Sequence, residues 1–90
     1  YQNQFNGETR IRYRVQGSGE SGWVTLKVYD VLGREVATLV NERKSPGLYT
    51  AGFNAADVPS GVYFYRLQVR SEQAGRGTAF AQVRKMILLR

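Results

Sequence analysis

The chain has 90 residues, a formal net charge of +6 and a hydrophobic fraction of 42%. This length fits one domain spanning residues 1–90, and the apolar content is that of a packed globule rather than of a disordered segment. Because the sequence contains no cysteine and no histidine, it excludes disulfide staples, Cys/His zinc sites and nucleophile systems that need an imidazole. We expect no metal and no cofactor.

The first strand signal lies at Thr9–Val15, where apolar and charged residues alternate. The alternation predicts a solvated face that carries Arg10, Arg12 and Arg14, opposite an apolar core face. A surface of this net charge is expected to adhere to polyanions such as lipopolysaccharide through salt-sensitive contacts. Because the basic residues are spread along the chain and do not form one cluster, no nucleic-acid partner is predicted.

Residues Trp23–Val40 are predicted to form a β-hairpin. The first strand of this hairpin starts at Trp23. Asp30–Gly33 fits a type I turn, in which the Asp30 side chain bonds the turn backbone and Gly33 takes a positive φ. The second strand covers Glu35–Val40.

The second half of the chain continues the pattern of strands and turns. Ser45–Leu48 fits a type II turn, and strands are predicted at Leu48–Phe53, Val62–Arg70 and Thr78–Leu89. No segment holds a helical period. These signals predict an all-β, antiparallel, immunoglobulin-like β-sandwich of about seven strands, with a small closed barrel as the alternative.

Motifs that could carry chemistry are explained better by structure. Gly17–Gly22 matches G-x-G-x-x-G, but a strand follows it, whereas nucleotide binding needs a helix there. Asp30, Glu35 and Asp57 could supply carboxylates for glycoside cleavage, yet their places at turns and strand edges favour capping roles. We therefore predict that the protein is not an enzyme.

An aromatic set could form a carbohydrate platform. Trp23, Tyr63 and Tyr65 would supply it, and a glycan-binding accessory module is one alternative function. The simpler interpretation places Tyr63 and Tyr65 in the core, with their hydroxyl groups reaching the rim of the sandwich.

Two central motifs and the end of the chain together resemble the C-terminal sorting domain of the bacterial type IX secretion system. That family carries V-Y-D-x-x-G-R-x-V, then S-G-x-Y-x-Y-R-L, and ends in a basic and apolar strand. The matching segments are Val28–Val36, Ser60–Leu67 and Arg84–Arg90. The residues expected to define the fold are Tyr29, Asp30, Gly33, Arg34, Gly61, Tyr63 and Tyr65. Gln2, Gln4 and Gly7 stand where the family usually has proline, which should loosen that segment.

The resemblance implies a domain that directs a larger passenger, N-terminal to it, through the type IX translocon across the outer membrane. It also implies a sortase-like protease as a partner, and a product that is secreted or attached to the cell surface after passing through the periplasm. The residues expected to be read by the translocon are Lys85, Met86, Ile87, Leu88, Leu89 and Arg90. With no tail beyond it, the last strand is expected to offer an open edge for strand addition.

A second resemblance leaves a structural function open. The immunoglobulin-like domain of the flagellar hook-capping protein shares the Y-D-x-x-G-R pattern, here Tyr29–Arg34. A domain of that kind scaffolds its neighbours and needs no C-terminal signal.

Overall fold

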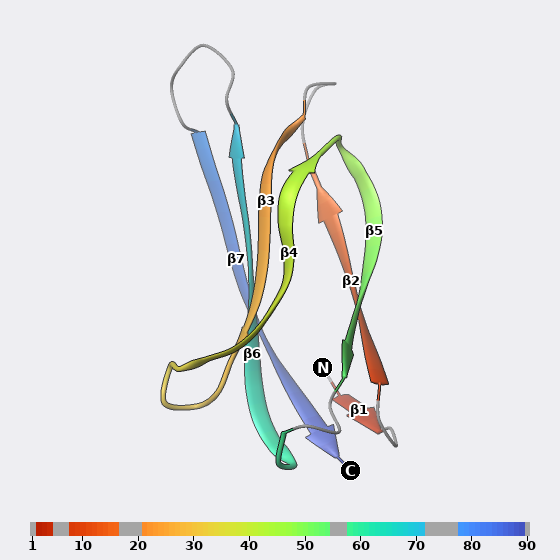
Figure 1. The fold of residues 1–90 in the computed structure, drawn as a ribbon, viewed down its shortest axis with the longest axis vertical. Helices are drawn as coiled ribbons and strands as arrows, with labels where there is room; N and C mark the ends of the chain where they lie inside the picture. The colour runs from red at the N-terminus through yellow and green to blue at the C-terminus, as the bar shows by residue number, and fades with distance from the viewer. Residues whose placement is uncertain (1, 5–7, 17–20, 55–57, 72–77, 90) are drawn as a thin grey trace.

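The computed structural model describes residues 2–4, 8–16, 21–54, 58–71 and 78–89. Every regular element in these ranges is a strand (Figure 1). The strands are β1 (Gln2–Gln4), β2 (Glu8–Val15), β3 (Gly22–Tyr29), β4 (Glu35–Lys44), β5 (Gly47–Asn54), β6 (Gly61–Ser71) and β7 (Thr78–Leu89).

The described strands form two sheets that pack as a sandwich. The larger sheet has the order β1-β7-β6-β3-β4, and the smaller one consists of β2 and β5. All pairs are antiparallel except β1 and β7, which are parallel. The prediction of an all-β sandwich is confirmed, and the closed-barrel alternative is wrong for the described strands because they divide into two separate sheets.

The core lies between the two sheets and is built by strict alternation along the strands. On β3, for example, Val24, Leu26 and Val28 are buried while the residues between them are half-buried. Burying one such side chain contributes about 1.5–3 kcal/mol relative to leaving it in water. The other buried apolar residues are Ile11, Tyr13, Val15, Val40, Ala51, Phe53, Tyr63, Tyr65, Leu67, Val69, Met86 and Leu88.

The predicted faces of β2 are confirmed. Arg10, Arg12 and Arg14 are exposed, and the apolar residues between them are buried. Thr9 is the buried polar residue of this strand, and its hydroxyl group has no hydrogen-bond partner among the described residues.

Strand β4 is longer and less regular than predicted. It runs to Lys44, because the polar stretch after Val40 continues the ladder with the start of β3. Two register shifts leave Val36 and Leu39 without a partner in the pairing of β4 with β3. Such bulges interrupt the apolar alternation within the strand. The end of β4 was missed because its last four residues, Asn41–Lys44, are polar and carry no apolar alternation.

Two tyrosines anchor the entries to β5 and β6 in the same way. The Tyr49 hydroxyl donates to the Ser45 carbonyl oxygen at 2.6 Å, and the Tyr63 hydroxyl donates to the Pro59 carbonyl oxygen at 2.7 Å. Each bond spans four residues and passes over a glycine, Gly47 or Gly61, with φ of 156° or 154°. The type II turn predicted at Ser45–Leu48 is therefore wrong, because that turn needs φ near about +80° at its glycine.

The tyrosine at the entry to β5 also joins the two sheets. Its ring stacks on Tyr13 of β2 with centroids 5.5 Å apart, and the Lys44 Nζ of β4 lies 4.5 Å from its centroid. The carboxylate of Glu42, 3.0 Å from that Nζ, raises the pKa of Lys44. The ammonium group therefore stays charged and retains its cation–π contact.

Candidate functional site

The turn between β3 and β4 is built around one carboxylate. The Asp30 carbonyl oxygen accepts from the Gly33 N–H at 3.0 Å, which closes the predicted turn, and Gly33 has φ of 85°. Asp30 Oδ1 accepts from the backbone N–H groups of Leu32 and Arg34, both at 2.9 Å. Asp30 Oδ2 accepts from Arg34 Nε at 2.9 Å. The first motif therefore encodes a rigid turn that leaves Arg34 largely exposed, at 73% of its side-chain surface.

The hydrogen bonds of this turn make its stability depend on pH. The backbone N–H of Arg34 is the main cause that lowers the pKa of Asp30 below its ordinary 3.8, and the Arg34 side chain adds to it. A carboxyl whose pKa is lower in the folded state stabilises the protein above its ordinary pKa, and this contribution is lost as pH falls through the lowered value.

We therefore expect Asp30→Asn to reduce the loss of stability on acidification. Urea midpoints measured at about pH 6 and about pH 3 should differ less for this variant than for the wild type. Glu35→Gln is the comparison variant. It should also reduce the loss of stability on acidification, because the pKa of Glu35 is lowered too, mainly by the hydrogen bond from the Thr38 hydroxyl. Identical acid sensitivity of wild type and Asp30→Asn would contradict the role given to this carboxylate.

The second motif, Ser60–Leu67, covers the start of β6 and the residue before it. Gly61 has φ of 154°, a backbone conformation that side-chain-bearing residues rarely adopt. Tyr63 is only 6% exposed and is held by its bond to Pro59. Tyr65 is equally buried, so the prediction that both tyrosines belong to the core is confirmed.

The structure brings the three motif segments together at one end of the larger sheet. The Asp30–Arg34 turn, the start of β6 and the end of β7 lie at the lower end of the molecule in Figure 1. Tyr29 pairs with Phe64, and Phe64 pairs with Lys85 on its other side. A cleft of about 560 Å³ separates the turn from residues 58–63.

The end of β7 is divided between the core and the surface. Met86 and Leu88 are buried, Lys85 is exposed and Ile87 is half-buried. The Leu89 side chain and Arg90 lie outside the described residues. Two of the predicted recognition residues thus serve the core.

The prediction that the last strand offers an open edge is wrong for Ile87–Leu89. Gln2–Gln4 pair in parallel with Ile87–Leu89 and form the strand β1, which their polar sequence does not predict. The edge of the last strand is therefore occupied here by the beginning of the chain. Gln2 and Gln4 lie in this strand although the family usually has proline there, and Gly7 lies outside the described residues.

Comparison with protein families places these motifs in context. A model described as the secretion system C-terminal sorting domain matches residues 2–77. The chain belongs to this family. No curated protein and no solved structure matches the chain. The matched region includes the first two motifs of the sorting domain but ends before β7.

Membership establishes the general function. The sorting domain directs the secretion of its cargo through the type IX system and belongs to a non-catalytic family. The cargo is secreted or attached to the cell surface. The domain therefore interacts with the secretion machinery and is joined to a passenger. No helix in the described part of the chain is long and apolar enough to cross a membrane.

The carboxylates considered for catalysis have structural partners in the sorting domain. Asp30 organises its turn, and Glu35 binds Lys27 at 3.3 Å and Thr38 Oγ1 at 2.6 Å. Asp57 lies outside the described residues. Across the same described ranges, no group of three or more His, Cys, Asp or Glu residues could hold a metal ion.

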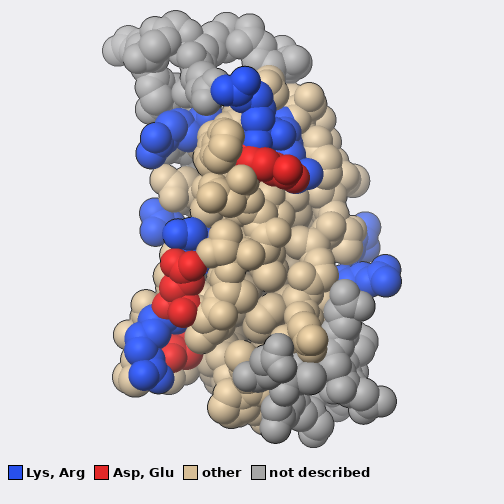
Figure 2. Space-filling view, viewed as in Figure 1, with Lys and Arg blue, Asp and Glu red and all other residues tan. Residues whose placement is uncertain are grey.

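The proposed carbohydrate platform is not assembled. Trp23 lies on the outer face of the larger sheet, is 39% exposed and donates to Asn41 Oδ1 at 2.8 Å. Tyr63 and Tyr65 are buried on the inner face. Since neighbouring strand positions point to opposite faces, these rings cannot stack on one sugar. Figure 2 shows Lys and Arg side chains scattered over one face, with acidic residues beside several of them.

Proposed function

We propose that the type IX machinery recognises the sorting domain at the end where the three motif segments meet. The observation that supports this proposal most directly is the pairing of Tyr29, Phe64 and Lys85 across three adjacent strands, beside the Asp30–Arg34 turn. A receptor that recognises folded cargo needs a surface that only the folded domain presents. This end of the domain combines the two matched motifs with the end of β7.

The residues at this end divide into supporting and contacting groups. Gly33, Gly61 and Tyr63 shape the turns, whereas Val31 and Leu32 at the tip are 64% and 73% exposed. Exposed apolar side chains of this kind are typical of protein contacts when they gather with charged residues. Arg34, Lys85, Val31 and Leu32 are the proposed contacts.

We include two further partners of the sorting domain in this proposal. A sortase-like protease acts on the exported product, and the net charge of +6 supports adhesion of the product to anionic lipopolysaccharide. The chain is proposed to act as one domain over residues 1–90.

An export assay tests the recognition surface. A reporter fused to the sorting domain is expressed in a bacterium with an active type IX system, and the fractions in the medium, on the cell surface and in the periplasm are measured. Leu32→Asp and Lys85→Glu should retain the reporter in the periplasm without unfolding the domain. Arg70→Glu, an equal charge reversal at an exposed position at the other end of β6, should be exported normally. Normal export of both end variants would overturn the proposal.

A further inference from the structure

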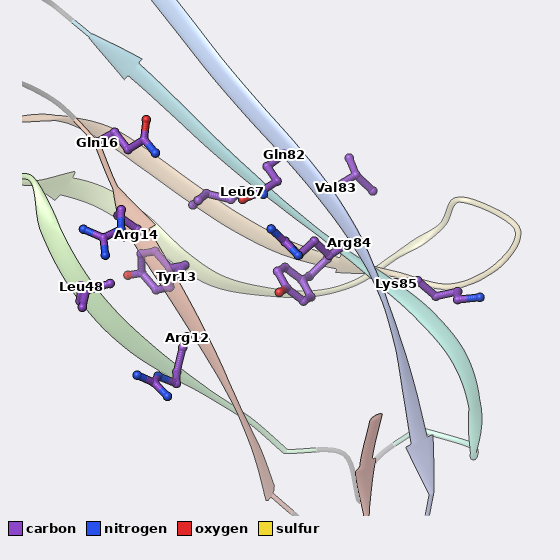
Figure 3. Close-up of a pocket in the computed structure, with 11 residues that line it drawn as sticks. Arg12, Tyr13, Arg14, Gln16, Leu48, Leu67, Gln82, Val83, Arg84 and Lys85 are labelled. Atoms are coloured by element: carbon purple, nitrogen blue, oxygen red, sulfur yellow. The ribbon is translucent and has the colours of Figure 1, made fainter. Parts of the chain in front are cut away.

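A second surface lies on the side of the sandwich, between β2 and β7. It is a groove of about 850 Å³. In Figure 3, the Arg84 side chain of β7 extends toward β2, and Leu67 of β6 is seen between the two strands. Tyr13 of β2 also lines the groove. The other lining residues are Arg12, Arg14, Gln16, Leu48, Tyr65, Gln82, Val83 and Lys85.

The groove exists because the smaller sheet is too narrow to cover the larger one. Gln82 and Arg84 pair with Leu67 and Tyr65, so they point to the inner face of their sheet. Their partners are buried, yet Arg84 is exposed and Gln82 half-buried. The two-stranded sheet therefore stops short of β7, and a strand added to it would cover this part of the inner face.

Both walls of the groove offer backbone groups for pairing. Among the described strands, β2 pairs only with β5, so its other edge is unpaired. β1 pairs with β7 only at Ile87–Leu89, which leaves the edge of β7 unpaired from Thr78 to Met86 within the described residues. Unpaired edges of this kind accept an extended segment of another polypeptide.

The charge of the groove indicates that a polypeptide segment bound there would be acidic. Arg12, Arg14, Arg84 and Lys85 line it, and no described carboxylate does. When the Gln82 amide is assigned with its oxygen facing Arg84, as the two donors there require, that oxygen accepts from Arg84 Nε at 3.1 Å and Nη2 at 2.7 Å. This neutral partner orients the guanidinium group without compensating its charge.

We propose that this groove binds an extended acidic polypeptide segment, which adds as a strand to the free edge of β2. Acidic side chains at alternate positions meet Arg12 and Arg14 on the outer rim, the side chains between them face Arg84 on the inner side, and the backbone continues the smaller sheet. The unpaired strand edges favour a polypeptide over an anionic glycan. The two surfaces share Lys85, but the segment is proposed to pair with β2, which takes no part in the recognition surface described above. Arg12 and Arg14 therefore test the groove alone, and Leu32 tests the recognition surface alone.

Binding can be measured with the ¹⁵N-labelled chain and a capped peptide of about eight residues that alternates glutamate and threonine, a length that spans β2. We expect amide shifts on β2 and on residues 81–86, and weaker binding as salt is raised. The reversal of two charges in Arg12→Glu/Arg14→Glu should weaken binding at least about tenfold, and Arg84→Gln should weaken it less. Circular dichroism confirms that each variant is folded.

Matched controls separate strand addition from general charge attraction. Arg66→Glu changes an exposed arginine of β6 outside the groove and should leave binding unchanged. A lysine–threonine peptide and an acidic peptide interrupted by prolines should not bind, because the first lacks the charge and the second lacks backbone donors. Equal binding of the proline peptide, equal weakening by Arg66→Glu, tighter binding of a heparin oligosaccharide, or no shifts at all would each overturn the proposal.

Discussion

Leu88→Ala is expected to lower the free energy of unfolding by about 2–5 kcal/mol. The Leu88 side chain is 1% exposed and sits where β7 pairs with Gly61 at the start of β6. Truncation removes apolar contacts and leaves a cavity between the sheets. Met86, which is fully buried two positions earlier on the same face, should show a loss in the same range.

Urea unfolding followed by circular dichroism measures this effect, and Lys85→Ala is the matched control. Lys85 is exposed on the same strand, so its truncation should change stability by no more than about 0.5 kcal/mol. Equal losses for Leu88→Ala and Lys85→Ala would show that the strand is not packed as described. If the difference holds, deletion of Lys85–Arg90 cannot separate lost recognition from lost folding, and single exposed substitutions are the proper export test.

Tyr63→Ala is expected to cost about 3–5 kcal/mol, the range found for truncating a buried aromatic ring. Tyr63 fills the core with its ring and fixes the β5–β6 connection through its hydroxyl group. Tyr63→Phe keeps the ring and removes only the hydrogen bond, so it should cost about 0.5–1.5 kcal/mol.

The tyrosine at the entry to β5 gives an internal comparison. Tyr49 makes the same bond to the carbonyl oxygen four residues before it, but its side chain is only partly buried. Tyr49→Ala should therefore cost less than Tyr63→Ala in thermal or urea unfolding. If the two alanine variants lost the same stability, the hydrogen bond rather than the buried ring would dominate the contribution of both residues.

The sequence predicted the strands whose alternation is uninterrupted and the turn whose residues bond locally. β2, β3 and β6 each place apolar side chains at every second position, and a period of two is a local property. Asp30 and Gly33 likewise act within one turn. β4 was predicted too short because its last residues, Asn41–Lys44, are polar. β1 was missed because Gln2–Gln4 are polar and are held only by pairing with a distant strand.

The candidate site was predictable only in part for the same physical reason. The first two motifs were identified from their residues, and the family comparison supports them over residues 2–77. Their meeting with the end of β7 depends on the register Tyr63–Met86, which is set by packing across the whole sheet and leaves no local signal. The groove does leave a signal in the sequence, since Gln82 and Arg84 occupy the same strand face as the apolar Met86 and Leu88.

The parallel ladder of β1 and β7 has a consequence for the timing of folding. It joins Gln2 to Ile87, so the chain must close its longest loop before this ladder can form. Pairings between such remote residues raise the contact order and slow folding, typically to about milliseconds to seconds for all-β domains. The end of the sheet that carries the motifs is therefore complete only once β1 has paired with β7. A transporter that binds this end would thereby distinguish the folded domain from chains in which this ladder has not yet formed.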